Sequence, residues 1–245
     1  MSPKLDIDAA GLSSEQLDLI QQFEADYNAV DRFLRGALQA TRQASFTSLV
    51  YEYSRKHPGW RDSDLLRTIA EVRNAIVHGK TEPYRYVAMP TPALSTALSA
   101  CRQRLLDPEL VVPKFQRPVV AVATVDSLSR VLKLVNQRDY SQFPVYDGDR
   151  FSGLLTENGI TRWLAGHVTG DLSLIDLDEV TVKKALREEE NKKAWKFVAR
   201  TMRVDDVLGL FSARPLLEAV LITANGKESE KLLGIATKWD ILQLP

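Results

Sequence analysis

The string from Arg73 to His78 combines residue types that could perform acid–base chemistry at a phosphate group. A neutral histidine can accept or donate a proton near pH 7, because its ordinary pKa lies close to that pH. An arginine stays charged and can stabilise negative charge that develops on phosphate oxygens. Asn74 lies one helical turn before His78 and could orient its ring or the backbone. Arg73, Asn74 and His78 are therefore our candidate catalytic residues.

A second set of candidate residues lies in an internal repeat. Residues 153–160 read GLLTENGI and residues 234–241 read GIATKWDI, so the two copies lie 81 positions apart. The second copy holds Thr237 and Asp240, whereas the first holds Thr156 but has Gly159 in place of the carboxylate. Threonine and aspartate at these positions are also typical of helix capping, so a purely structural role is an alternative.

The first 107 residues are predicted to be helical. Ser13 and Gln16 form a capping sequence before a run of apolar residues spaced by three and four, which indicates one helical face. Three further helices are expected over residues 45–56, from 62 or 63 to 78 with Gly79 as its cap, and about 91–106. These helices make an all-α domain over residues 1–107.

Three prolines at positions 108, 113 and 118 predict a linker over residues 108–118. Beyond it, short β-rich runs alternate with short helices, and Asp-Gly and Asn-Gly pairs at 147–148 and 225–226 indicate hairpins. Two repeats are therefore expected, over residues 119–170 and 171–245. The charged stretch at 183–193, between the repeated strings, is predicted to be a solvated helix face or loop.

The Phe143-Pro144-Val145 strand, the hairpin and the Gly-x-x-Thr string, in this order and repeated, resemble a pair of CBS domains over about residues 117–245. The resemblance implies βαββα-type repeats and an adenine nucleotide (AMP, ADP or ATP) as a regulatory ligand. It also implies that Thr237 and Thr156 contact phosphate and that Asp240 accepts hydrogen bonds from ribose hydroxyls. Because the first copy lacks that carboxylate, one nucleotide site per chain is expected. By charge and position, Arg200 and Lys238 are further candidate phosphate partners.

The Arg-Asn-x-x-x-His string at the end of an expected helix is similar to the motif of HEPN domains, over about residues 12–108. The resemblance implies a metal-independent endoribonuclease that works as a homodimer, in which His78 moves the proton of the RNA 2′-hydroxyl or of the leaving oxygen. The fold class expected for the whole chain is α+β, a HEPN-like helical bundle followed by a tandem CBS pair.

Helix geometry restricts how this motif could work. Arg73 falls within the apolar stripe of its helix, so it needs an acid, carbonyl groups or a bound phosphate as a partner. On an ideal helix Arg73 and His78 point about 140° apart, at 100° per residue. Either the helix is distorted near His78 and Gly79, or a twofold dimer brings two motifs together. The alternatives are that His78 is a C-terminal cap and that Arg73 forms a structural ion pair.

Composition excludes several classes of protein. The chain has 245 residues, with 32 basic and 32 acidic side chains, and this balance argues against a broad surface that tracks nucleic acid. The single cysteine, Cys101, excludes an internal disulfide and a cysteine zinc cluster, and no metal is expected. No apolar run approaches the ~20 residues of a membrane helix, so a cytoplasmic protein without a membrane partner is expected.

Two hypotheses follow for the whole chain. The first is an endoribonuclease that is regulated by an adenine nucleotide bound to the CBS pair. The second is a non-catalytic nucleotide sensor or dimeric adaptor, in which the helical domain only mediates association.

Overall fold

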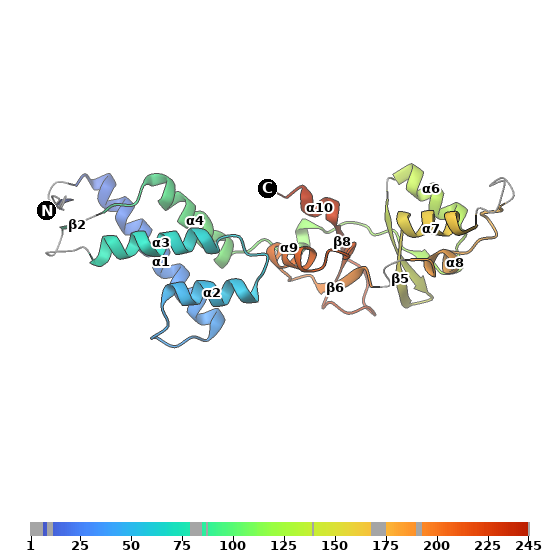
Figure 1. Cartoon of the computed structure of the whole chain (residues 1–245), viewed down its shortest axis with the longest axis horizontal. Helices are drawn as coiled ribbons and strands as arrows, with labels where there is room; N and C mark the ends of the chain where they lie inside the picture. Colours follow the sequence, from blue (N-terminus) through green and yellow to red (C-terminus); the bar gives the residue numbers. More distant parts are fainter. Residues whose placement is uncertain are drawn as a thin grey trace. The chain divides into compact units, whose positions relative to one another are not determined.

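In the computed structural model the chain folds as two units, residues 1–109 and 110–245 (Figure 1). The structure describes residues 7–8, 12–78, 85–86, 88–138, 140–167, 175–189 and 193–244. Within these ranges, the side chains at 7–8, 77–78 and 85–86 lie outside the description, and so does the expected cap at Gly79.

The N-terminal unit is helical, as predicted. Its elements are β1 (Ile7–Asp8), α1 (Ser14–Leu38), α2 (Phe46–Lys56), α3 (Ser63–His78), β2 (Arg85–Tyr86) and α4 (Pro92–Leu106). α1 packs against α2 and α4, and α3 packs against the same two helices (Figure 1). The helices start where capping residues allow, because Ser13 and Gln16 form a reciprocal capping box and Thr91 caps α4.

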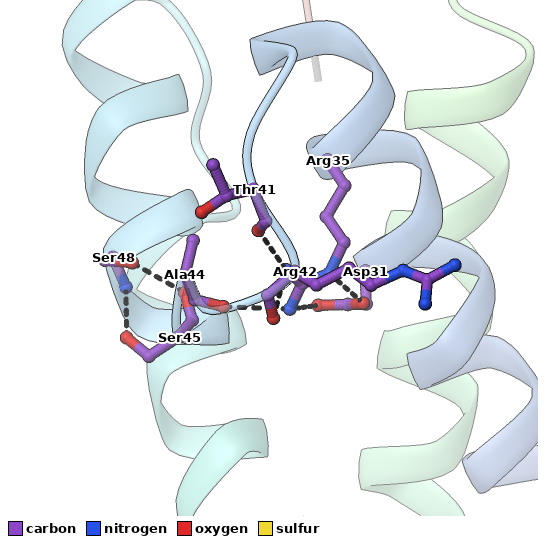
Figure 2. Close-up of polar contacts among 7 residues, drawn as sticks. All are labelled: Asp31, Arg35, Thr41, Arg42, Ala44, Ser45 and Ser48. Carbon is purple, nitrogen blue, oxygen red and sulfur yellow. Dashed lines mark hydrogen bonds and ion pairs between the residues drawn. The ribbon is translucent and has the colours of Figure 1, made fainter.

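The turn between α1 and α2 is held by one arginine (Figure 2). Arg35 donates two hydrogen bonds to Asp31, at 2.7 and 3.1 Å, and further ones to the carbonyl oxygens of Thr41 and Ala44 at 3.0 and 2.9 Å. Ser45 then caps α2 by accepting from the backbone N–H of Ser48. The side chain of Arg35 therefore fixes the path by which the chain enters α2.

The C-terminal unit contains two repeats of the same topology. The first comprises β3 (Val122–Ala123), α6 (Leu128–Arg138), β4 (Gln142–Asp147), β5 (Arg150–Thr156) and α7 (Glu157–His167). The second comprises β6 (Trp195–Ala199), α9 (Val204–Ala213), β7 (Ala219–Thr223), β8 (Gly234–Thr237) and α10 (Lys238–Leu242). In each sheet the first strand pairs in parallel with the second, and the second pairs antiparallel with the third. The predicted βαββα order and the mixed α+β class are confirmed.

A short segment before each repeat packs into the core of the other repeat. α5 (Val111–Lys114) and Phe115 join the core of the second repeat, and Gln116 bridges to Gly234 of β8. Conversely, α8 (Val182–Leu186) contributes Val182 and Ala185 to the core of the first repeat. We call residues 110–117 and 175–189 the crossing segments.

The crossing segments change two sequence-based expectations. The linker expected over residues 108–118 contains α5, whose Val111 is fully buried. Residues 175–189, expected in the second repeat, pack with the first. The proline spacing correctly predicted that no long helix forms in this segment. It could not predict that Val111 is buried, because the residues that bury it lie far away in the sequence.

Candidate functional site

Thr237 and Asp240 meet where β8 passes into α10. Asp240 Oδ2 accepts hydrogen bonds from the Thr237 backbone N–H at 2.7 Å and from the Thr237 hydroxyl at 2.8 Å. The two residues form a capping box at the start of α10, so the capping role is present. The interaction also holds the carboxylate in a fixed orientation.

The carboxylate of Asp240 has a second partner from the first crossing segment. Arg117 binds it in a bidentate manner, with Nη1 to Oδ1 at 2.8 Å and Nη2 to Oδ2 at 2.7 Å. Burial alone raises the pKa of Asp240, but hydrogen bonds from Arg117 and Thr237 outweigh it and hold the pKa below its usual value. Asp240 is therefore ionised at neutral pH.

A cavity of about 550 Å³ opens beside this carboxylate. Arg117 and Arg138 contribute two cations to its wall, and Tyr140 and Trp239 contribute two aromatic rings. Trp239 is 69% exposed, so its ring is available to a ligand. The volume lies within the range of small-molecule pockets, and the wall combines ring faces, cations and the acidic residues Asp240 and Glu157.

Sequence reasoning missed both arginines of this cavity. Arg117 lies in the segment interpreted as a linker, and Arg138 ends α6. Their sequence signal is weak, since isolated surface arginines are common.

Arg200 remains a predicted phosphate partner, and its backbone lies at the other end of the sheet from Thr237. Arg200 follows β6, and its backbone N–H donates to Thr223 at the far end of β7. Thr237 pairs with Ala219 at the opposite end of β7, four residues away or about 13 Å along a strand. Lys238 pairs with Glu218 at 2.9 Å.

The equivalent position in the first repeat is built differently. Thr156 is buried and caps α7, because its hydroxyl accepts from the Gly159 N–H at 3.0 Å. The carboxylate beside it comes from Glu189, whose Oε1 lies 2.6 Å from the Thr156 nitrogen and whose Oε2 lies 3.2 Å from the hydroxyl. Burial raises the pKa of Glu189, and this effect exceeds the lowering by the Thr156 hydrogen bonds.

The helical unit places Arg73 and Asn74 on one cavity of about 310 Å³. Arg73 is half-buried, and its guanidinium carbon lies 5.2 Å above the centre of the Tyr27 ring. This aromatic face on α1 is a partner that the sequence analysis did not anticipate. The cavity also includes Asp31 and Arg35, whose charges compensate each other. The side chain of His78 lies outside the described residues.

The described ranges hold neither a candidate metal site nor a candidate membrane-spanning helix. No group of three or more His, Cys, Asp or Glu side chains there could hold a metal ion. None of the described helices is both long and apolar enough to cross a bilayer.

Comparison with known proteins identifies the class of domain. The family model of the CBS domain matches residues 114–166, which confirms the predicted CBS domain in the first repeat. The second repeat shares its topology, as described above. No protein in the search of curated proteins matched the chain.

Several solved CBS proteins are similar to part of this chain. The CBS domain pair of protein MJ0100, in complex with 5′-methylthioadenosine and S-adenosyl-L-methionine, is 17% identical, with 56% of this chain and 94% of that chain covered and a TM-score of 0.40. A hemolysin-like CBS protein of Oenococcus oeni PSU is 16% identical, with 56% and 90% covered and a TM-score of 0.41. A CBS-domain-containing protein from Agrobacterium tumefaciens is 17% identical, with 52% and 88% covered and a TM-score of 0.39.

Proposed function

We propose that residues 110–245 form a CBS pair that senses an adenine nucleotide in the cavity beside Asp240. The observation that carries the proposal is the ionised carboxylate, which Thr237 orients at the wall of a cavity with two arginines. A carboxylate suits the two hydroxyls of ribose, and guanidinium groups suit phosphate. AMP, ADP and ATP are the ligands of this class.

Arg117 and a bound nucleotide would compete for the carboxylate of Asp240. Its guanidinium occupies the same Asp240 oxygens that ribose hydroxyls would use. A nucleotide would displace Arg117 from the carboxylate, and the released guanidinium could then bind phosphate together with Arg138. Arg117 belongs to the crossing segment that directly follows residue 109, the last residue of the helical unit. We propose that its displacement is the step by which the ligand regulates that unit.

The first test removes the carboxylate. Asp240→Ala should weaken AMP binding at least about 100-fold, since two hydrogen bonds to a charged acceptor contribute about 1.5–3 kcal/mol each. Calorimetry with AMP, ADP, ATP and cyclic dinucleotides measures this, and Asp240→Asn retains the shape without the charge. Asp149→Ala, at an exposed position in the β4–β5 turn, is the matched control. No heat from any ligand with the unmodified protein would refute the proposal.

A companion variant tests the competition at Asp240. Arg117→Ala should strengthen adenosine binding, because the carboxylate loses its internal partner, and should weaken AMP binding, because phosphate loses a cation. The ratio of the two affinities should fall about tenfold, the value of one charge-assisted hydrogen bond. Arg138→Ala should weaken the binding of AMP and leave the binding of adenosine unchanged. An equal change for both ligands in Arg117→Ala would show that Arg117 does not compete with ribose.

As a second function we propose RNA cleavage by a HEPN-like helical unit, in a homodimer and without a metal. The supporting observation is that Arg73 and Asn74 line the same cavity. In the alternative, the helical unit only associates with a partner and the chain is a non-catalytic sensor or adaptor.

An assay on a mixed RNA pool separates these two functions. Arg73→Ala and His78→Ala should each lower cleavage about 100- to 1,000-fold, as expected when a charge-stabilising or proton-transfer group is lost. Arg67→Ala is the control, because Arg67 is an exposed arginine on the same helix. If the unmodified protein and the three variants cleave RNA equally, the cleavage is background, and the adaptor role is the function that remains.

A further inference from the structure

Glu189 occupies the place of the carboxylate that the first repeat lacks. It accepts from the backbone N–H and the hydroxyl of Thr156, the same two donors that Asp240 uses on Thr237. Only 8% of Glu189 is exposed. The two repeats thus have the same threonine–carboxylate contact, but in the first repeat the acid comes from the second crossing segment.

Gly159 makes this substitution possible. It stands at the position equivalent to Asp240 in the repeated strings. A Cβ atom at Gly159 would lie 2.0 Å from Oε1 of Glu189 and 2.3 Å from its Cδ. A side chain at position 159 and the present position of Glu189 are therefore mutually exclusive.

The two crossing segments deliver opposite charges to the two sites. Arg117 lies three residues after α5 and reaches Asp240, whereas Glu189 lies three residues after α8 and reaches Thr156. Glu218 lines the cavity of about 350 Å³ beside Thr156, whereas Glu157 lines both this cavity and the one beside Asp240.

We infer that Glu189 is an internal replacement for the missing carboxylate and that it closes the first-repeat site to nucleotides. Both of its oxygens accept hydrogen bonds from Thr156, and its burial keeps them from ribose hydroxyls. Glu189 and Gly159 together determine that only the second repeat takes the ligand. This inference rests on the proposed nucleotide site at Asp240.

A double-mutant cycle tests the replacement without any ligand. Gly159→Asp alone should lower the thermal unfolding midpoint, because the Glu189 carboxylate must leave the Thr156 donors and two acids come together. Glu189→Ala alone should lower it less. In the double variant Gly159→Asp with Glu189→Ala, the new aspartate can use the Thr156 donors, and most of the loss should be recovered. If Gly159→Asp alone does not fold, recovery of a folded double variant gives the same answer, whereas independent and additive effects would overturn the inference.

Calorimetry with AMP then tests closure of the site. The unmodified protein should bind one AMP per chain, and the double variant should bind two. In a protein that also carries Asp240→Ala, the double change should raise the stoichiometry from no AMP to one AMP per chain. A stoichiometry that stays at one in the double variant would overturn the closure. Failure of the proposed function is distinguishable, because it would appear as absent binding in the unmodified protein, whereas the unfolding cycle needs no nucleotide.

Discussion

Asp26→Ala is expected to destabilise the helical unit by about 3 kcal/mol, because it breaks a buried ionic cluster between α1 and α4. The side chain of Asp26 is 2% exposed. Its Oδ1 accepts from Gln22 at 3.0 Å and lies 2.9 Å from Nε of Arg102, and its Oδ2 accepts from the hydroxyl of Ser99. Removal of the carboxylate leaves the Gln22 amide and the Ser99 hydroxyl without their acceptor, and it leaves Arg102, whose side chain is only 37% exposed, without its ionic partner.

Urea unfolding measures this loss of stability, and hydrogen exchange of the α1 amides assigns it to the helical unit. Glu52→Ala is the matched control, because Glu52 pairs with Arg55 on the surface of α2 at 2.9 Å, with both side chains largely in solvent. We expect the control to change stability by about 0.5 kcal/mol or less. Similar losses in the two variants would show that burial adds nothing to the Asp26 cluster.

The elements that were predicted from sequence are those specified by local chemistry. Ser13 and Gln16 set the start of α1 within a few residues, and Thr91 does the same for α4. The repeat at 153–160 and 234–241 predicted two copies of one unit, because the same string recurs after a hairpin, and the resemblance to CBS domains implied the βαββα order. Asp26 could also have been noticed, since it lies three residues after Phe23 and four before Val30 on the buried face of α1.

The parts that were not predicted depend on contacts between distant segments. The charged stretch at 183–193 was predicted to be solvated, yet Glu189 is buried against Thr156. Composition alone cannot distinguish one acid in such a stretch from its neighbours, because the hydrogen-bond donors and the space that accommodate Glu189 exist only in the folded chain. Arg117 shows the same effect, because it reaches the site from 123 residues away in the sequence.

The crossing segments explain why the candidate site was only half predicted. Thr237 and Asp240 belong to a local motif, and the motif identified them. Their cationic partner comes from the segment before the other repeat, so its identity depends on which core that segment enters. Val111 and Phe115 decide this by packing into the second repeat, which brings Arg117 to Asp240. The composition of the site is therefore a consequence of hydrophobic packing a few residues upstream.

This dependence gives the second large expected effect, that of Gly234→Ala. A Cβ atom at Gly234 would lie 2.2 Å from the carbonyl oxygen of Phe115, 3.0 Å from its carbon and 3.2 Å from Cα of Gln116, all of them backbone atoms. The first crossing segment would have to move away from β8, which unpacks Phe115 and shifts Arg117. We expect a loss of about 2–3 kcal/mol in the stability of the C-terminal unit, typical of overpacking. The affinity ratio of AMP to adenosine should fall as in Arg117→Ala.

Gly166→Ala is the control for this variant, since nothing lies within 4 Å of a Cβ atom at that position in α7. Alanine is a better helix former than glycine by about 1 kcal/mol, so the control should be neutral or stabilising. Urea unfolding of both variants, with calorimetry on AMP and adenosine, separates the two consequences. A Gly234→Ala protein that keeps full stability would show that the crossing segment is free to move. A protein that loses stability but keeps the ligand ratio would show that the position of Arg117 does not depend on this packing.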